Sequence, residues 1–361
     1  MGKLTRINWV FYCLLIFAIS RIILTYEFDL AKNIFIHKNA DFFTTMCKWD
    51  CKWYLTIIND GYDLHIRTSP RVWSGLANWA FFPLYPYIVK IVVSLISSDV
   101  IITGIILNQI FILLSLLVFY KYLKLSFDET NSRFGVILLA FSPFSVYFAS
   151  LYTESLFLLL SLSAFYFMRI NRPYISAIFG GLLSATRPVG IMFSLVYFLY
   201  GIRKKSQPSL IWGTLISMFG LIIYMVYLHY HVGDFLAFEH IQRGWGRTGF
   251  QLTRIGSQLL KMVMDYNNSG LFVFSCIIAV WLFINKYYEE AIFNLLCILP
   301  GFMTGTMLSE GRFCGTLFTF YLGLVLISKK SNSLKIGLAV VFFVFYISYF
   351  MYWLSRAKFL I

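Results

Sequence analysis

The first candidate for acid–base chemistry is Asp50, which stands between aromatic and basic residues just after the first apolar segment, in residues 49–54 (WDCKWY). A carboxylate here must lie in a watery site, because burying its charge in hydrocarbon would cost several kcal/mol. In such a site it can act as a general base on a hydroxyl. The rings of Trp49, Trp53 and Tyr54 favour this interpretation, since aromatic faces suit sugar rings and anchor loops at membrane interfaces. The alternatives are a solvated loop residue and the cap of a short helix.

Two arginines are candidates for holding an anion. Arg187 precedes Pro188 inside an apolar region, and the residue before a proline is biased away from helix, so the sequence predicts a helix break. A guanidinium near the membrane needs an anionic partner, and arginine binds phosphate in a bidentate manner. Arg312 stands at the predicted start of another helix. The alternative for Arg187 is snorkelling to lipid phosphate.

The segment 233–247 is dense in donors and acceptors, and it supplies Asp234, Gln242, Trp245 and Arg247 as candidates for substrate binding. An ordinary amphipathic helix at the membrane interface is the alternative for this segment.

Glu154 opens a later apolar segment and is a further candidate for substrate binding. The competing interpretation is structural: Thr153 would cap the helix, and Glu154 would face its positive end. A divalent cation between Asp50, Glu154 and Asp234 is possible, although no spacing demands it, and the cysteines show no zinc spacing. No other cofactor is indicated.

Composition indicates a polytopic membrane protein. The 361 residues are 59% hydrophobic and 13% charged, whereas ordinary soluble domains carry roughly 25% charged residues. Apolar runs fill whole segments without a polar stripe, as helices in lipid require. The net charge of +14 is explained by basic cytoplasmic loops, so no nucleic acid partner is expected.

Apolar runs and basic clusters together predict eleven spans in one domain, residues 1–361, with a cytoplasmic N-terminus. The spans are 8–26, 100–120, 134–149, 155–168, two short pieces within 174–202, 210–230, 271–285, 291–307, 313–328 and 334–354. Residues 27–99 form a long first extracytoplasmic loop, whose apolar stretch up to residue 96 is expected at the interface. Cys47 and Cys51 could pair there if the space is oxidising, and the other four cysteines are expected to pack in the apolar segments.

Taken together, these motifs resemble the GPI mannosyltransferase 2 (PIG-V-like) family and its bacterial relatives. The resemblance rests on residues 49–54 with 61–62, the run 81–86 (FFPLYP), residues 152–157 (YTESLF), residues 186–187, and the pattern of Gly233, Asp234, Gln242 and residues 245–247. At positions 53–54 this chain has Trp-Tyr, as the bacterial branch does, where eukaryotic members have a His-Phe pair.

The resemblance implies a glycosyltransferase of the GT-C type, which takes mannose from a polyprenyl- or dolichyl-phosphate donor on the outer face of the membrane. The aspartate that such enzymes carry in the first outer loop falls on Asp50. A phosphate leaving group needs little help from an acid, so one carboxylate suffices, and in-line attack inverts the anomeric centre. Arg187 and Arg312 are then expected on the donor phosphate, with a glycolipid or glycan hydroxyl as acceptor.

A bacterial inner membrane is the expected location, with the endoplasmic reticulum as the alternative. Two rival functions stay open at this point: a transporter or flippase for lipid-linked sugars, and a non-catalytic subunit of a lipid-glycosylation complex.

Overall fold

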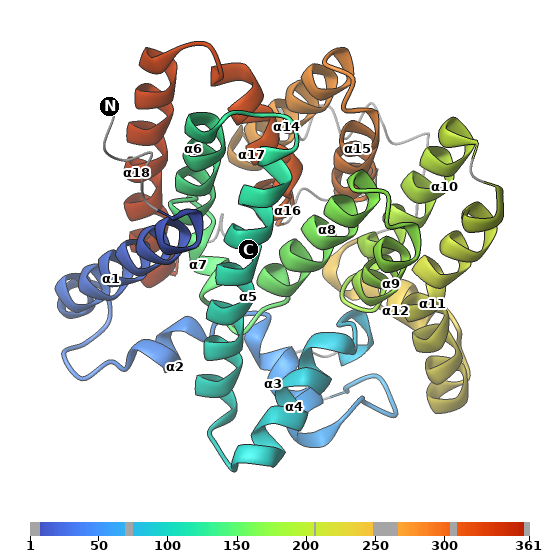
Figure 1. The fold of residues 1–361 in the computed structure, drawn as a ribbon. Coiled ribbons are helices and arrows are strands. Elements are labelled where there is room, and N and C mark those ends of the chain that lie inside the picture. Colours follow the sequence, from blue (N-terminus) through green and yellow to red (C-terminus); the bar gives the residue numbers. More distant parts are fainter. Residues whose placement is uncertain (1–7, 69–74, 206, 248–265, 304–308, 357–361) are drawn as a thin grey trace.

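The computed structural model describes residues 8–68, 75–205, 207–247, 266–303 and 309–356, and in these ranges the chain forms helices and connecting turns (Figure 1). The helices are α1 (Trp9–Phe35), α2 (Phe42–Met46), α3 (Cys51–Asp60), η2 (Asn78–Ala80), α4 (Leu84–Ile96), α5 (Val100–Lys124), α6 (Glu129–Ala140), α7 (Ser145–Phe148), α8 (Glu154–Arg169), α9 (Pro173–Ser184), η3 (Pro188–Ile191), α10 (Met192–Lys204), α11 (Gln207–Val232), α12 (Ala237–His240), η4 (Ile241–Trp245), α14 (Tyr266–Ile284), α15 (Tyr288–Met303), α16 (Glu310–Gly315), α17 (Phe318–Ser328) and α18 (Asn332–Leu354). The predicted all-α class is confirmed.

Lipid is the natural surrounding of this helix bundle. Among the described residues four helices, α1, α5, α11 and α18, are long and apolar enough to cross a membrane, and shorter apolar helices accompany them in α4, α9, α14 and α17. Large apolar side chains such as Ile22 and Trp212 are exposed on the outside of the bundle, where lipid covers them. The chain is a polytopic integral membrane protein, and the number of eleven spans stays a prediction.

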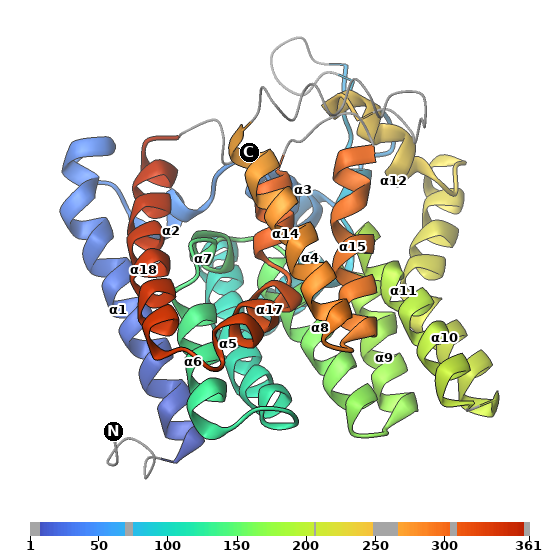
Figure 2. The same ribbon diagram turned by 90° about the horizontal axis from the view of Figure 1, so that it is seen from above.

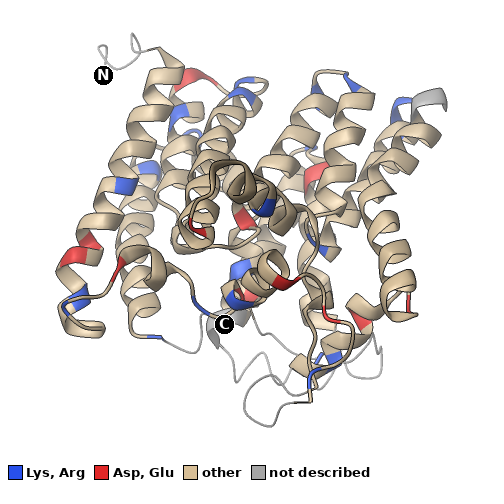
Figure 3. Ribbon diagram, turned by 90° about the horizontal axis from the view of Figure 1, so that it is seen from below, with Lys and Arg blue, Asp and Glu red and all other residues tan. Residues whose placement is uncertain are grey.

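The predicted cytoplasmic ends lie together at one end of the molecule. In Figure 2 the start of α1 and the turns α5–α6, α8–α9, α10–α11 and α17–α18 share the lower end, while α3 and α12 lie toward the upper end. Figure 3 shows Lys and Arg at the helix ends on the side of the N-terminus. The helices therefore alternate in direction as the basic clusters predict, and the side that faces the cytoplasm remains a prediction.

The first helix is longer than predicted. The sequence predicts an end near Tyr26, but α1 continues to Phe35, so residues 27–35 belong to this helix and not to the loop. No glycine or proline interrupts residues 27–35, and Lys32 forms an ion pair with Asp29 at 2.7 Å along the helix. Polar residues can therefore extend a spanning helix beyond its apolar part.

Two predicted spans are broken helices. The prediction of one helix over 134–149 is wrong, because the chain leaves α6 at residues 141–144, which contain Pro143. The span 313–328 is likewise divided into α16 and α17. The buried hydroxyl of Tyr321 supports both breaks. It donates to the Gly315 carbonyl at 2.6 Å, beside the second break, and lies 2.5 Å from the Ser142 hydroxyl in the first. Breaks inside a membrane protein need such partners.

The segment between α3 and α4 is held by a compact network of hydrogen bonds. The Asn78 side chain donates to the Gly61 carbonyl at 3.0 Å and accepts from the backbone of Asp63 at 2.9 Å. The Tyr62 hydroxyl donates to the Phe81 carbonyl at 2.7 Å. These bonds fold residues 61–82 back over α3, and this places the Phe81 ring beside the start of that helix.

Candidate active site

A cavity of about 310 Å³ opens between the first loop, the starts of α8 and η3, η4, the end of α15 and α16. Eight of the eleven site residues predicted from the sequence line it: Asp50, Tyr54, Glu154, Arg187, Gln242, Trp245, Arg247 and Arg312. They come from segments far apart in the chain, so the fold brings together what the sequence only suggested.

Alternating charges line this cavity in one continuous chain. Arg312 lies between two carboxylates, with its Nη1 2.8 Å from Asp50 Oδ2 and its Nε 3.3 Å from Glu154 Oε1. The same Glu154 oxygen accepts from Arg187 Nη1 at 2.9 Å. The side chains of Arg312 and Glu154 are 9% and 3% exposed, whereas that of Asp50 is 28% exposed. Asp50 is therefore the open end of a mostly buried network.

Three arginines converge on one aromatic ring. The guanidinium carbons of Arg187, Arg312 and Arg247 lie 4.9, 5.3 and 5.4 Å from the centre of the Phe313 ring. Cations are attracted to an aromatic face at such distances. The ring thus gathers three positive charges around one point of the cavity without adding a negative charge to it.

The carboxylate of Asp50 is turned away from its own helix. Asp50 occupies the cap position of α3, but its side chain makes no capping bond, so the capping interpretation is wrong. Its backbone amide donates instead to the Tyr152 hydroxyl at 3.3 Å. Within the described chain Oδ1 has no protein partner, while Oδ2 accepts from Arg312. One oxygen of Asp50 is available to take a proton.

Glu154 holds arginines and has no capping role. Thr153 stands at the cap position of α8 without a capping bond, and its hydroxyl lies 3.3 Å from that of Tyr54. Glu154 is buried and reaches across to the arginines on the two other elements. Glu154 therefore has the sequence context of an ordinary helix start, although its side chain positions Arg187 and Arg312.

Arg187 lies at the predicted break. Its backbone is extended, with φ −155° and ψ 151°, between α9 and η3. Gly190 allows the chain to turn here, because a Cβ at this residue would lie 2.2 Å from the Leu183 carbonyl oxygen. The side chain points to Glu154 in the cavity and is 12% exposed, so a lipid phosphate is not its partner here.

The charge network shifts the pKa values of two arginines in opposite directions. Burial alone would lower the pKa of the Arg312 guanidinium, but the charges of Asp50 and Glu154 outweigh burial and raise it. Burial, with the charge of Arg312 beside it, lowers the pKa of Arg247. Arg247 is a half-buried cation with Arg312 and Arg187 nearby, and the charges of Glu310 and Asp50 offset their repulsion only in part. An incoming anion would relieve the remaining repulsion.

Three predicted residues do not line the cavity. Trp49 packs edge-on against Trp353 at 4.7 Å, and Trp53 stacks on Phe81, which stands between it and the cavity. Asp234 is paired with a histidine in an exposed position. Trp49 and Trp53 therefore support the walls of the site.

Two residues that sequence reasoning missed complete the site. Phe313 is one apolar residue among many, and only its place after Arg312 could have singled it out. Glu310 is fully buried, and among the described residues its Oε2 has no hydrogen-bond partner. It lies behind Gly301, which lines the cavity, because a Cβ at residue 301 would be 1.7 Å from that oxygen.

A cation between Asp50, Glu154 and Asp234 has no support in this arrangement. Among the described residues no three His, Cys, Asp or Glu side chains lie close enough together to hold a metal ion. Arg312 stands between Asp50 and Glu154 where such an ion would have to be.

Comparison with known families gives one match. A family model described as Mannosyltransferase (PIG-V) matches residues 12–225. The matched range contains Asp50, Glu154 and Arg187, while Arg247 and Arg312 come after it. No curated protein matches the chain significantly.

Proposed function

This chain belongs to the mannosyltransferase (PIG-V) family and is a membrane glycosyltransferase, and from that premise we propose that it moves mannose from a polyprenyl-phosphate donor to a hydroxyl of a glycolipid or glycan. The reaction takes place in the cavity around Asp50, on the extracytoplasmic face of a bacterial cell membrane, in an enzyme of the GT-C type. The observation that carries the proposal is the chain Asp50–Arg312–Glu154–Arg187, which sets an accessible carboxylate beside paired guanidinium groups.

The arginines bind the donor phosphate. Arg187, Arg247 and Arg312 surround one ring, and a phosphate monoester or diester placed there meets several N–H donors at once. The bridging bond breaks with its electron pair going to the phosphate oxygen, so negative charge grows where the arginines stand. Their attraction is then stronger in the transition state than in the bound donor, which is the condition for catalysis.

Asp50 acts as the general base. Its free oxygen Oδ1 takes the proton of the acceptor hydroxyl while the acceptor oxygen bonds to the anomeric carbon. The carbon–phosphate-oxygen bond breaks on the opposite side, and the configuration inverts. A positioned base contributes a factor of about 10²–10⁴ to the rate. Arg312 holds the other oxygen of Asp50 at 2.8 Å and links this carboxylate to the phosphate site.

The remaining wall suits the sugar and the lipid. Gln242 and Trp245 line the cavity, and the Trp245 ring lies edge-on to Phe81 with the ring centres 6.0 Å apart. The amide and the aromatic faces can orient sugar hydroxyls and rings there. Phe157, Val189 and Leu317 form an apolar part of the lining. The prenyl chain of the donor would leave the cavity along such a surface and enter the bilayer.

The test of this proposal is a donor comparison with purified protein in lipid nanodiscs. We expect transfer from polyprenyl-phosphate-mannose, and none from nucleotide-activated mannose, because the apolar part of the cavity lining suits a prenyl chain and not a charged nucleotide. Asp29→Asn, which changes an exposed carboxylate far along α1, is the control and keeps wild-type transfer. Transfer from the nucleotide sugar alone would overturn the assignment of the donor.

A further inference from the structure

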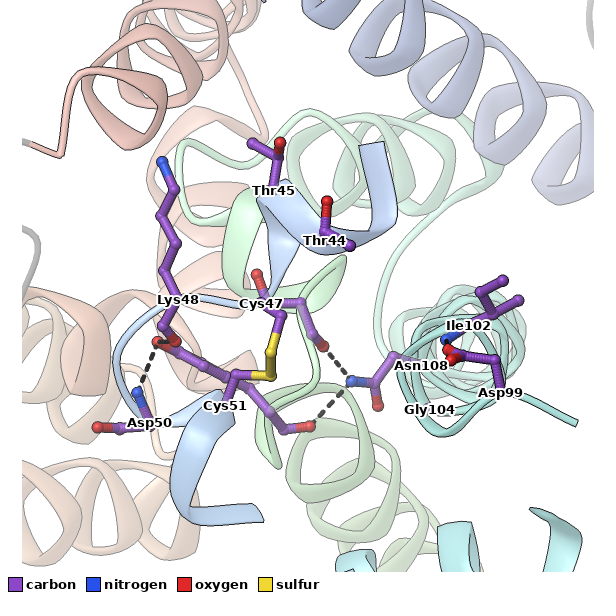
Figure 4. The surroundings of a disulfide bond; sticks show 12 residues. Thr44, Thr45, Cys47, Lys48, Asp50, Cys51, Asp99, Ile102, Gly104 and Asn108 are labelled. Carbon is purple, nitrogen blue, oxygen red and sulfur yellow. Dashed lines mark hydrogen bonds between the residues drawn. A yellow bond between two sulfur atoms is a disulfide. The ribbon is translucent and has the colours of Figure 1, made fainter. Parts of the chain in front are cut away.

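The loop that carries Asp50 is closed by a covalent bond. Cys47 and Cys51 form a disulfide with their Cα atoms 5.2 Å apart, and the closed ring contains Lys48, Trp49 and Asp50 (Figure 4). Cys47 directly follows the end of α2, and Cys51 is the first residue of α3. Asp50 is therefore held between two fixed points one turn apart.

The conformation inside the ring is unfavourable for a free chain. Trp49 has a φ of +43°, in the left-handed region that L-residues with a Cβ seldom occupy. Such a conformation persists where the surroundings enforce it. The disulfide and the packing of the Trp49 ring against Trp353 do so here.

Lys48 anchors the same ring to a distant helix. Its ammonium group donates to the carbonyls of Trp353 and Leu354 at 2.6 and 3.3 Å, at the end of α18. The Trp353 indole donates in return to the carbonyl of Thr45 at 3.1 Å, just before the ring. A cation at carbonyls of a helix C-terminus is also favoured by the helix dipole.

A third support approaches from the other side. The Tyr152 hydroxyl donates to the Lys48 carbonyl at 3.0 Å and accepts from the Asp50 amide at 3.3 Å. Asn108, fully buried, donates to the backbone carbonyl of Tyr152 at 2.9 Å and holds this tyrosine in place. Figure 4 shows Asn108 on one side of the disulfide and Lys48 with Asp50 on the other. No such set of contacts is needed for a loop that only connects two helices.

We propose that the Cys47–Cys51 disulfide and Lys48 are positioning residues for the transfer, so that the enzyme reaches its full rate only with this pair oxidised. The inference rests on the proposed role of Asp50. Neither cysteine touches the cavity, and both act through the carboxylate between them. The site is consequently assembled only where thiols are oxidised, which is the outer side of the membrane.

The experiment is reduction of the purified protein in nanodiscs with a water-soluble phosphine. The phosphine gives two electrons to the disulfide, water supplies the oxygen of the phosphine oxide and the two protons, and two thiols result. Thiol labelling after denaturation checks the state: four thiols before reduction and six after it, from the four free cysteines and the pair. Cys47 is a half-buried residue, whereas Cys51 is buried, so the reductant approaches from the side of Cys47.

We expect kcat to fall about 10- to 100-fold on reduction, because a misplaced catalytic group costs rates of this order. The KM for polyprenyl-phosphate-mannose should stay unchanged, since Arg187 and Arg312 lie on other elements. The double variant Cys47→Ala/Cys51→Ala should match the reduced enzyme and not respond to phosphine. Cys276→Ser, which removes a thiol on α14 outside the cavity, should behave as wild type in both states.

Variants of Lys48 test the proposal independently of the disulfide. Lys48→Met should lower kcat at unchanged KM, and Lys48→Arg, which keeps the cation at the two carbonyls, should restore most of the rate. A purely structural role would instead lower the melting temperature of both variants without this split.

Hydrogen exchange separates this inference from the proposed function. Reduction should speed amide exchange in residues 48–54 at least tenfold and leave α5 unchanged. If a six-thiol enzyme keeps its kcat within twofold, or if this exchange does not change, the positioning role is refuted. If the oxidised enzyme transfers no mannose while the exchange responds, the proposed function fails, although the disulfide still orders the loop that carries Asp50.

Discussion

Glu154 is the residue through which the charge network is most sharply tested. It is 3% exposed and holds Arg187 and Arg312 at 2.9 and 3.3 Å. Glu154→Gln keeps the size of the side chain but removes the charge that both guanidinium groups face. A hydrogen bond to a charged group contributes about 1.5–3 kcal/mol. Losing one such contact in the transition state lowers the rate roughly 10- to 150-fold.

The assay is initial-rate transfer from polyprenyl-phosphate-mannose by purified variants, normalised to folded protein. Glu129→Gln is the matched control, because it breaks a glutamate–arginine pair with Arg133 at 2.5 Å at the opposite end of the bundle. It should lower stability without changing the rate per folded molecule. If Glu154→Gln transfers mannose within twofold of wild type, Glu154 does not position the arginines for catalysis.

Three further predictions follow from single contacts. Phe313→Leu removes the ring that gathers the three arginines. It should raise the KM for the donor about tenfold, which corresponds to a loss of roughly 1.4 kcal/mol of binding free energy. Phe313→Tyr, which keeps an aromatic ring, should stay near wild type in the same steady-state kinetics. Burial raises the pKa of the Glu310 carboxyl from 4.5 to about 8, against the opposing charge of Arg247. The folded chain then binds a proton that the unfolded chain has released in this window, so stability falls as pH rises from about 4.5 to about 8. Melting temperatures at about pH 5 and about pH 9 should differ less in Glu310→Gln than in wild type, and an equal difference would contradict the assignment. Gly301→Ala would place a Cβ 1.7 Å from Glu310 Oε2 and should lower the melting temperature clearly, whereas Gly337→Ala, with open space around it, should not.

The sequence predicts the class and course of the helices well, because long apolar runs and basic clusters are strong signals in a membrane protein. The break at Arg187 is confirmed for the reason given, since a proline follows it. The breaks at residues 141–144 and 316–317 differ from the prediction. Pro143 marks the first one in the sequence, whereas the second lies in an apolar run without proline and is held by the Tyr321 hydroxyl on the Gly315 carbonyl. Apolarity alone does not show where a span is interrupted.

The candidate site was predicted in part. Asp50, Arg187 and Arg312 stood out as charges beside apolar segments, and the fold brings them into one cavity. Their pairing could not be predicted, because it depends on which helix ends meet in space. Glu154 has the sequence context of an ordinary helix start, and its role follows only from the position of Arg187 across the cavity.

The aromatic residues mark the limit of such reasoning. Trp49 and Trp53 suggested stacking on a sugar, yet both rings pack against other rings of the protein. An aromatic residue suits a sugar and a protein core equally well, so its type does not distinguish the two. Trp245, by contrast, lines the cavity as predicted.

The most direct test of the account is single-turnover transfer by wild type and Asp50→Asn, with donor binding measured on the same preparations. Asparagine cannot take the acceptor proton but leaves the arginine cluster in place. We expect Asp50→Asn to bind polyprenyl-phosphate-mannose at least as tightly as wild type and to transfer it about 10²–10⁴ times more slowly. Transfer by Asp50→Asn at the wild-type rate would contradict the role of Asp50 as the base.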